Sequence, residues 1–154
     1  MDVEEIGNGL AALLGAQDVE VAATQFPAIE AHAAALVTLG QRLGDPVIWP
    51  IGAAAERIAG AATLISAGGV RLREWNTTVR GQRVLIFVVV ALTPLSLFAG
   101  ARQALNMGAV AVDACGLRVD GLEGAGLGPL ANLHVVSGDF LAAPTAARRP
   151  LIVH

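Results

Sequence analysis

The chain has 154 residues, a formal net charge of -3 and 55% hydrophobic residues. This length supports one domain with a buried core. The mean hydropathy of +0.62 is high for a soluble monomer, so we expect apolar surface that an oligomer would cover. All ten basic residues are arginine and they form no basic run, which argues against binding to nucleic acid.

The cysteine and histidine content excludes several kinds of site. Cys115 has no second cysteine to pair with, and its apolar neighbours predict a buried, unreactive thiol. The histidines at 32, 134 and 154 match no metal-ligand spacing, so we expect no metal and no resident cofactor. The acidic start "MDVEEIGNGL" lacks the basic start of a secretory signal, so we expect a cytoplasmic protein.

Helical and strand-like patterns alternate along the first half of the chain. Apolar residues recur at helical spacing from Val3 to Leu14, and Pro27 is well placed to open a second helix. The predicted elements are a helix over 3–15, a strand over 18–24, a helix over 27–44, a strand over 45–50, a helix over 51–69, a strand over 69–75 and a polar connector over 76–83.

The uncharged stretch Val84–Gly100 has two interpretations, a membrane anchor or the centre of a buried α/β domain. A membrane span needs about 20 uninterrupted apolar residues. Here Thr93 and Pro94 interrupt the run, and this pair suits the start of a helix. The preceding residues are β-branched and aromatic, typical of a strand buried on both faces. We therefore favour a strand over 84–92 and a helix over 94–108, and expect no membrane association.

The helix over 94–108 has an apolar stripe and a glycine, Gly108, suited to its end. The stripe comprises Leu97, Phe98, Ala101, Ala104, Leu105 and Gly108. Beyond it we expect a strand over 109–119, a glycine-rich loop, a last strand over 132–137 and a loosely structured tail over 141–154. The alternation predicts a single-domain α/β fold, with a mainly parallel sheet flanked by helices, over residues 1–154.

Ligands of such sheets bind where strands end and helices begin. Two turns meet this description, one around 49–56 and one around 91–96. The hydroxyls of Thr93 and Ser96 lie at a helix start, where a small phosphate-bearing ligand could bind. Ordinary helix capping explains the same residues.

The order of elements from Leu10 to Val136 resembles that of type I phosphoribosyltransferases, in particular the orotate phosphoribosyltransferase-like branch. The likeness is sharpest over 80–108, where Gly81 and Arg83 lead into a hydrophobic strand and then a helix. The resemblance implies a phosphoribosyltransferase-like fold, and it implies magnesium as a cofactor if the chain is an active transferase.

The substrate-binding positions that the resemblance implies carry other residue types here. The acidic pair that holds the ribose hydroxyls falls on Val88 and Val89. The phosphate loop falls on Leu92, Thr93, Pro94, Leu95 and Ser96, where Pro94 removes a backbone donor and Leu95 adds bulk. The pyrophosphate turn falls on Ile51, Gly52, Ala53 and Ala54. The mobile loop would lie within 73–83 and lacks lysine, leaving Arg73 and Arg80 as its cations.

Three functions follow from these patterns. The first is a catalytically impaired phosphoribosyltransferase-like protein that acts by assembly, as a homodimer or a hetero-oligomer with a related subunit. The second is a divergent active transferase with substitute carboxylates, for which Glu56, Glu74 and Asp113 are candidates, although Asp113 is expected at a solvated strand end. The third is a protein anchored in a membrane by 84–100. The sequence assigns no catalytic residue.

Overall fold

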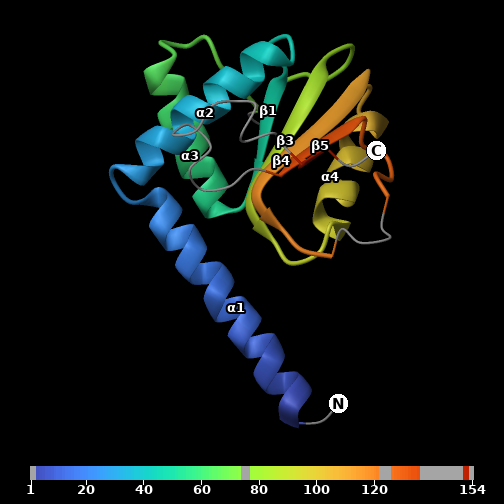
Figure 1. Ribbon diagram of the computed structural model, residues 1–154. Coiled ribbons are helices and arrows are strands. Elements are labelled where there is room, and N and C mark those ends of the chain that lie inside the picture. The colour runs from blue at the N-terminus through green and yellow to red at the C-terminus, as the bar shows by residue number, and fades with distance from the viewer. Residues whose placement is uncertain (1–2, 74–76, 122–125, 136–150, 153–154) are drawn as a thin grey trace.

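The computed structural model describes residues 3–73, 77–121, 126–135 and 151–152, which form a central sheet with helices on both faces (Figure 1). The helices are α1 (Val3–Thr24), α2 (Ala28–Arg42), α3 (Ala53–Ile65) and α4 (Leu95–Asn106). The strands are β1 (Val47–Ile51), β2 (Arg71–Leu72), β3 (Arg83–Ala91), β4 (Ala111–Val119), β5 (Asn132–Val135) and β6 (Leu151–Ile152). The predicted α/β class is confirmed.

The strand order of the described sheet is β2-β1-β3-β4-β5-β6. The first five strands are mutually parallel, and β6 pairs antiparallel with β5. From β1 the chain passes through α3 to the edge strand β2. It then returns to the other side of β1 as β3 and continues outward. The direction of the winding therefore reverses between β1 and β3.

The central strand β3 has apolar side chains on both faces because the sheet is covered on both sides. Leu85, Phe87 and Val89 pack in a core with α1, α2 and α3. Val84, Ile86 and Val88 pack in a second core with α4. Every residue of β3 from Val84 to Ala91 is buried, as predicted for a strand without a solvent face.

The boundary between β3 and α4 follows the Thr-Pro prediction with a shift of one residue. Pro94, rather than Thr93, is the N-cap, and the Thr93 hydroxyl accepts a hydrogen bond of 3.3 Å from the Leu95 N–H. Gly108, with a φ of +99°, follows the end of α4 as expected. Leu105, at the border of the predicted stripe, is exposed, so its assignment to the core was wrong.

The N-terminal helix does not stop near Gly15. It continues as α1 to Thr24, so the strand predicted over 18–24 is wrong. The alternation of acidic residues and valines in this segment suits a strand, but Ala16, Val19 and Ala23 also recur at helical spacing. These three residues pack on the core beneath α2 and α3, which favours the helix. The glycine is tolerated within it at a modest free-energy cost.

The structure also corrects the predictions for the strand over 69–75 and for the C-terminal tail. The strand expected over 69–75 is reduced to β2, and residues 74–76 lie outside the described part. Within the tail, β6 was not foreseen, while residues 136–150 lie outside the described part. The stretch proposed as a membrane anchor is divided between β3 and α4, and no helix among the described residues is long and apolar enough to cross a bilayer.

Candidate functional site

The candidate site lies at the carboxyl ends of β1 and β3, where the winding reverses. Helix α3 follows β1 on one face of the sheet, and α4 follows β3 on the other face. This arrangement is the one in which parallel sheets bind ligands, between the two diverging helix starts. The register pairs Ile51 with Val88, so β3 extends to Ala91 beyond the end of β1. We call this region the carboxyl edge.

The turn from β1 into α3 is the position expected for pyrophosphate. Ile51 is half-buried, Gly52 and Ala53 are exposed, and Ala54 is buried. Gly52 has a φ of +94° and a ψ of 157°, a conformation nearly restricted to glycine. A Cβ added at this glycine would meet no atom within 4 Å. The backbone conformation, and not a close neighbour, therefore requires glycine here.

The positions expected for the acidic pair lie inside β3. Val88 is 5% exposed and packs in the α4-side core, whereas Val89 is 2% exposed and packs in the opposite core. Their side chains thus point to different faces of the sheet. A carboxylate at either position would leave water for an apolar environment, which strongly disfavours its charged form.

The phosphate-loop position, Leu92–Ser96, presents few groups that could bind an anion. Leu92 is half-buried against the core on the α1–α3 side, and Pro94 is buried. Leu95 is 67% exposed and adds an apolar side chain at the surface of this turn. Thr93 and Ser96 are exposed, but the hydroxyl of Thr93 already accepts the Leu95 N–H.

The end of β4 closes against the same turn. The Asp120 N–H donates to the Ala91 carbonyl at 2.8 Å, and a Cβ on Gly121 would lie 3.4 Å from Pro94 Cδ. The Asp120 carboxylate accepts two hydrogen bonds from Arg118, at 3.2 and 3.1 Å. Our sequence interpretation missed this ion pair at the carboxyl edge. Its signal was the position of both residues at the end of a strand predicted to neighbour β3.

The two arginines suggested for a mobile loop contact different parts of the protein. The Arg73 guanidinium lies 3.6 Å from the ring centroid of buried Trp49, so these two side chains stack on each other. Arg80 lies beside Gly108, at the opposite end of the sheet. Among the substitute carboxylates, Glu56 is exposed in the first turn of α3, and Glu74 lies outside the described residues.

Asp113 is not at a solvated strand end, which corrects our expectation. It is fully buried in the first half of β4, away from the carboxyl edge. Its carboxylate accepts a hydrogen bond of 2.6 Å from Arg83 Nε and one of 3.0 Å from the Asn132 amide. Three neighbouring parallel strands are therefore joined by this polar cluster, which we call the Asp113 cluster. The geometry indicates a structural role.

Cys115 and His32 are two further reactive groups among the described residues, and both are buried. Burial, with a contribution from the charge of Asp113, raises the pKa of the Cys115 thiol to about 12, so the thiol stays protonated at neutral pH. Burial lowers the pKa of His32, which lines a small apolar cavity of about 30 Å³ with Cys115. No group of three or more acidic, histidine or cysteine residues in the described part could hold a metal ion. The described part of the chain therefore supplies no cluster that would hold a magnesium ion by protein groups alone.

Comparisons with known proteins identify the fold. No family model matches the sequence, and no curated protein matches it significantly. Among solved structures, a hypoxanthine-guanine-xanthine phosphoribosyltransferase is similar with a TM-score of 0.50 and 14% sequence identity. The match covers 68% of this chain and 71% of that one. The chain thus has a phosphoribosyltransferase-like α/β fold, as the resemblance implied.

Proposed function

We propose that this protein is a catalytically impaired phosphoribosyltransferase-like protein that acts by assembly, as a homodimer. The observation that carries the proposal is the burial of Val88 and Val89 in two apolar cores. The strand is tightly packed where an enzyme of this class would need charged groups in contact with the ribose. At these two positions the side chains stabilise the hydrophobic cores, and we infer that they do not contact a ligand.

The neighbouring turns support the first half of the proposal. Pro94 supplies no backbone donor, and Leu95 is an exposed apolar side chain at the start of α4. The turn at Gly52 has a positive φ and free space beside its α-carbon, but no arginine precedes Arg57 on α3. A small phosphate at Thr93 and Ser96 stays a weaker alternative, since the first hydroxyl is already engaged.

Helix α1 supports the second half. Figure 1 shows its N-terminal portion projecting away from the sheet, and Leu13 and Leu14 are 53% and 61% exposed. In the sequence, Val3, Ile6, Leu10 and Leu13 follow the 3-4-3 spacing of a helix-pairing seam. The core contacts of α1 come from Ala16, Val19 and Ala23 in its C-terminal half, and an isolated helical segment shorter than about 12–15 residues is marginally stable in water. A second copy would supply the matching helix, and a related subunit is the alternative occupant.

Two measurements test the two halves separately. Calorimetry with phosphoribosyl pyrophosphate and magnesium should give no binding heat, and saturable binding that depends on magnesium would refute the loss of catalysis. Analytical ultracentrifugation should show a dimer that Leu13→Glu with Leu14→Glu dissociates. The matched variant Leu64→Glu, at a leucine that is 83% exposed on α3, should leave the dimer intact. A wild-type monomer would refute the assembly.

A divergent active transferase is the second candidate, and Asp120 is the observation that favours it. Asp120 is held beside the Leu92–Ser96 turn by the hydrogen bond from its N–H to the Ala91 carbonyl. Its carboxylate, which pairs with Arg118, could replace part of the missing acidic pair. Pyrophosphate release assayed with orotate and with purine bases tests this function. Activity that Asp120→Asn abolishes would support it over the impaired enzyme.

A further inference from the structure

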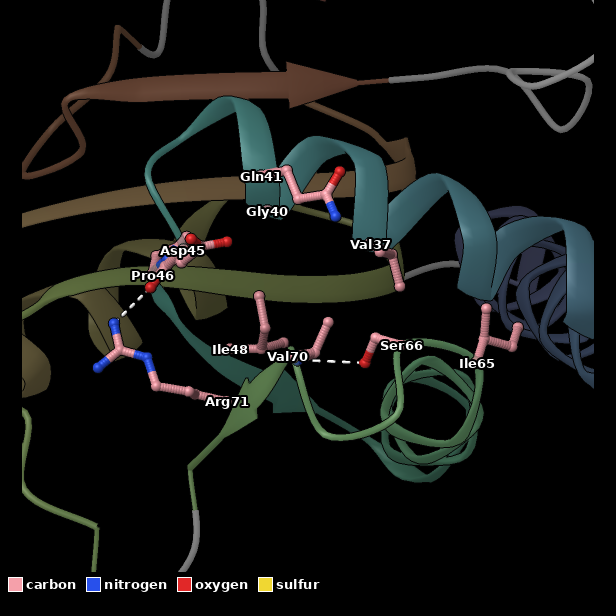
Figure 2. A pocket seen from close by; sticks show the side chains of 11 residues that line it. Val37, Gly40, Gln41, Asp45, Pro46, Ile48, Ile65, Ser66, Val70 and Arg71 are labelled. Carbon is pink, nitrogen blue, oxygen red and sulfur yellow. Dashed lines mark hydrogen bonds between the residues drawn. The ribbon is translucent and has the colours of Figure 1, made fainter.

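A second hollow lies at the opposite, amino-terminal edge of the sheet, outside the region that the proposed function concerns. It is a pocket of about 250 Å³ enclosed by the ends of α2 and α3 and the starts of β1 and β2 (Figure 2). The residues that line it are Val37, Gly40, Gln41, Asp45, Pro46, Ile48, Ile65, Ser66, Gly69, Val70 and Arg71. We call it the amino-edge pocket.

One part of this pocket is aliphatic. Figure 2 shows Val37 pointing from α2 toward Ile48 and Val70, which point toward it from the sheet. Gly40 faces this wall, since an added Cβ would lie 4.0 Å from Ile48 Cδ1, an ordinary contact distance. The volume lies between that of a benzene-sized cavity and that of a pocket for a drug-sized molecule. A ligand with a short branched hydrocarbon group fits such a space.

The rim of the pocket carries two opposite charges that do not neutralise each other. The guanidinium of Arg71 donates to the backbone carbonyl of Asp45 and, at 3.0 Å, to the side-chain oxygen of Gln82. Both acceptors are uncharged, so these bonds position the guanidinium without neutralising its charge. Within the described residues the Asp45 carboxylate forms no ion pair, whereas the Arg83–Asp113 and Arg118–Asp120 pairs do form. Both charged groups are therefore left for a ligand.

The backbone around the rim holds these groups in place. Asp45 has a φ of +58°, a left-handed conformation that aspartate tolerates, and its N–H donates to the Gly40 carbonyl at 2.9 Å. The hydroxyl of Ser66 accepts the Val70 N–H at 3.1 Å and joins the end of α3 to the start of β2. The pocket is thus formed by two fixed turns, one between α2 and β1 and one between α3 and β2.

We propose that the amino-edge pocket binds a zwitterionic α-amino acid with an aliphatic side chain. The ammonium group would pair with Asp45, the carboxylate with Arg71, and the hydrocarbon group would contact Ile48 and Val70. Phosphate would leave the aliphatic wall unused and would be repelled by Asp45. A nucleobase would fill the volume but leave both charges unpaired. Both charged residues are exposed, so we expect a dissociation constant of about 0.1–1 mM.

Calorimetry with L-leucine tests the site, and two ligand analogues test the roles of the charges. Isopentylamine lacks the carboxylate and 4-methylpentanoate lacks the ammonium group, and each should bind about tenfold more weakly than L-leucine. Asp45→Asn and Arg71→Gln should each weaken L-leucine binding about tenfold, and Arg71→Lys should recover part of the loss.

The matched controls are Glu56→Gln and Arg118→Gln, an exposed acid and an exposed arginine at the carboxyl edge, which should leave L-leucine binding unchanged. Equal melting temperatures of the variants would establish that each is folded. The absence of heat with leucine, valine and isoleucine up to millimolar concentrations would overturn the proposal. Binding that the Asp45 and Arg71 variants leave unchanged, or binding of adenine in place of amino acids, would overturn it too. None of these outcomes depends on catalysis or on the dimer.

Discussion

The two edges of the sheet differ in the side chains that they offer to a ligand. The carboxyl edge has the backbone geometry of a ligand site, with a glycine turn at Gly52 and diverging helix starts, but Val88 and Val89 are packed into the cores. The amino edge has a pocket with Asp45 and Arg71 on its rim. A fold therefore determines where a ligand could bind, whereas the side chains determine whether binding chemistry is present.

The largest expected effect comes from placing an acid back in β3. Val89→Asp buries a carboxyl group in an apolar core and should lower the free energy of unfolding by about 3–5 kcal/mol, or prevent folding. Val110→Asp, the same change at a valine that is 67% exposed, should change it by less than about 0.5 kcal/mol. Urea denaturation measures both. A stable Val89→Asp protein that gained affinity for phosphoribosyl pyrophosphate would contradict the contrast between the edges.

A second comparison sets an ion pair whose carboxylate is buried, Arg83–Asp113, against an exposed pair, Arg118–Asp120. Asp113→Ala removes the acceptor of both the Arg83 and the Asn132 hydrogen bonds and should cost about 2–4 kcal/mol of stability. Asp120→Ala removes an exposed pair beside the candidate site and should cost less than about 1 kcal/mol. Chemical denaturation of both variants checks the difference. Equal losses would show that Asp113 is not the structural centre of its cluster.

Replacing Gly52 and replacing Gly60, both in the α3 region, should change the free energy of unfolding in opposite directions. Gly52→Ala forces a side chain into a φ of +94° and should destabilise by about 1–3 kcal/mol. Gly60→Ala, within α3 and with no atom near the new methyl group, should stabilise by about 0.5–1 kcal/mol. The melting temperatures of both variants, compared with that of the wild type, measure the two effects. A neutral Gly52→Ala would mean that this turn relaxes readily.

The smallest effect concerns Cys115 and alkaline pH. The folded state raises the pKa of this thiol from 9.0 to about 12 and so retains its proton where the unfolded chain loses it. The stabilisation is complete below pH 9 and declines as the pH rises toward 12, by about 1 kcal/mol between pH 8 and 10. Urea denaturation across this range should show the decline in the wild type and a smaller one in Cys115→Ala. If the free energy of unfolding fell with pH at the same rate in both proteins, the result would argue against the burial of the thiol.

Much of the fold was predictable because local signals and tertiary packing agree. The Thr93–Pro94 pair divides the apolar stretch at nearly the correct residue, and Gly108 ends the following helix. The segment over 18–24 misled us because its valines suit either a strand or a helix. Only the packing of Ala16 and Ala23 on the core distinguishes the two.

The polar features of the site were harder to predict because they depend on strand register. Asp113 meets Arg83 across two parallel strands, and no local pattern in the sequence indicates that pairing. The amino-edge pocket likewise joins Asp45, from the turn between α2 and β1, with Ser66 and Arg71 at the two ends of the turn between α3 and β2. Periodicity locates helices and strands, but it does not show which of their ends meet.

The most direct test follows backbone amide signals by NMR while the protein is titrated with magnesium and phosphoribosyl pyrophosphate, and separately with L-leucine. We predict that the signals of Gly52, Leu95 and Ser96 do not move with the first ligand. We also predict that those of Val70 and Arg71 move saturably with the second. Saturable shifts at Gly52 and Ser96 with phosphoribosyl pyrophosphate would contradict the account, because they would show a working substrate site at the carboxyl edge.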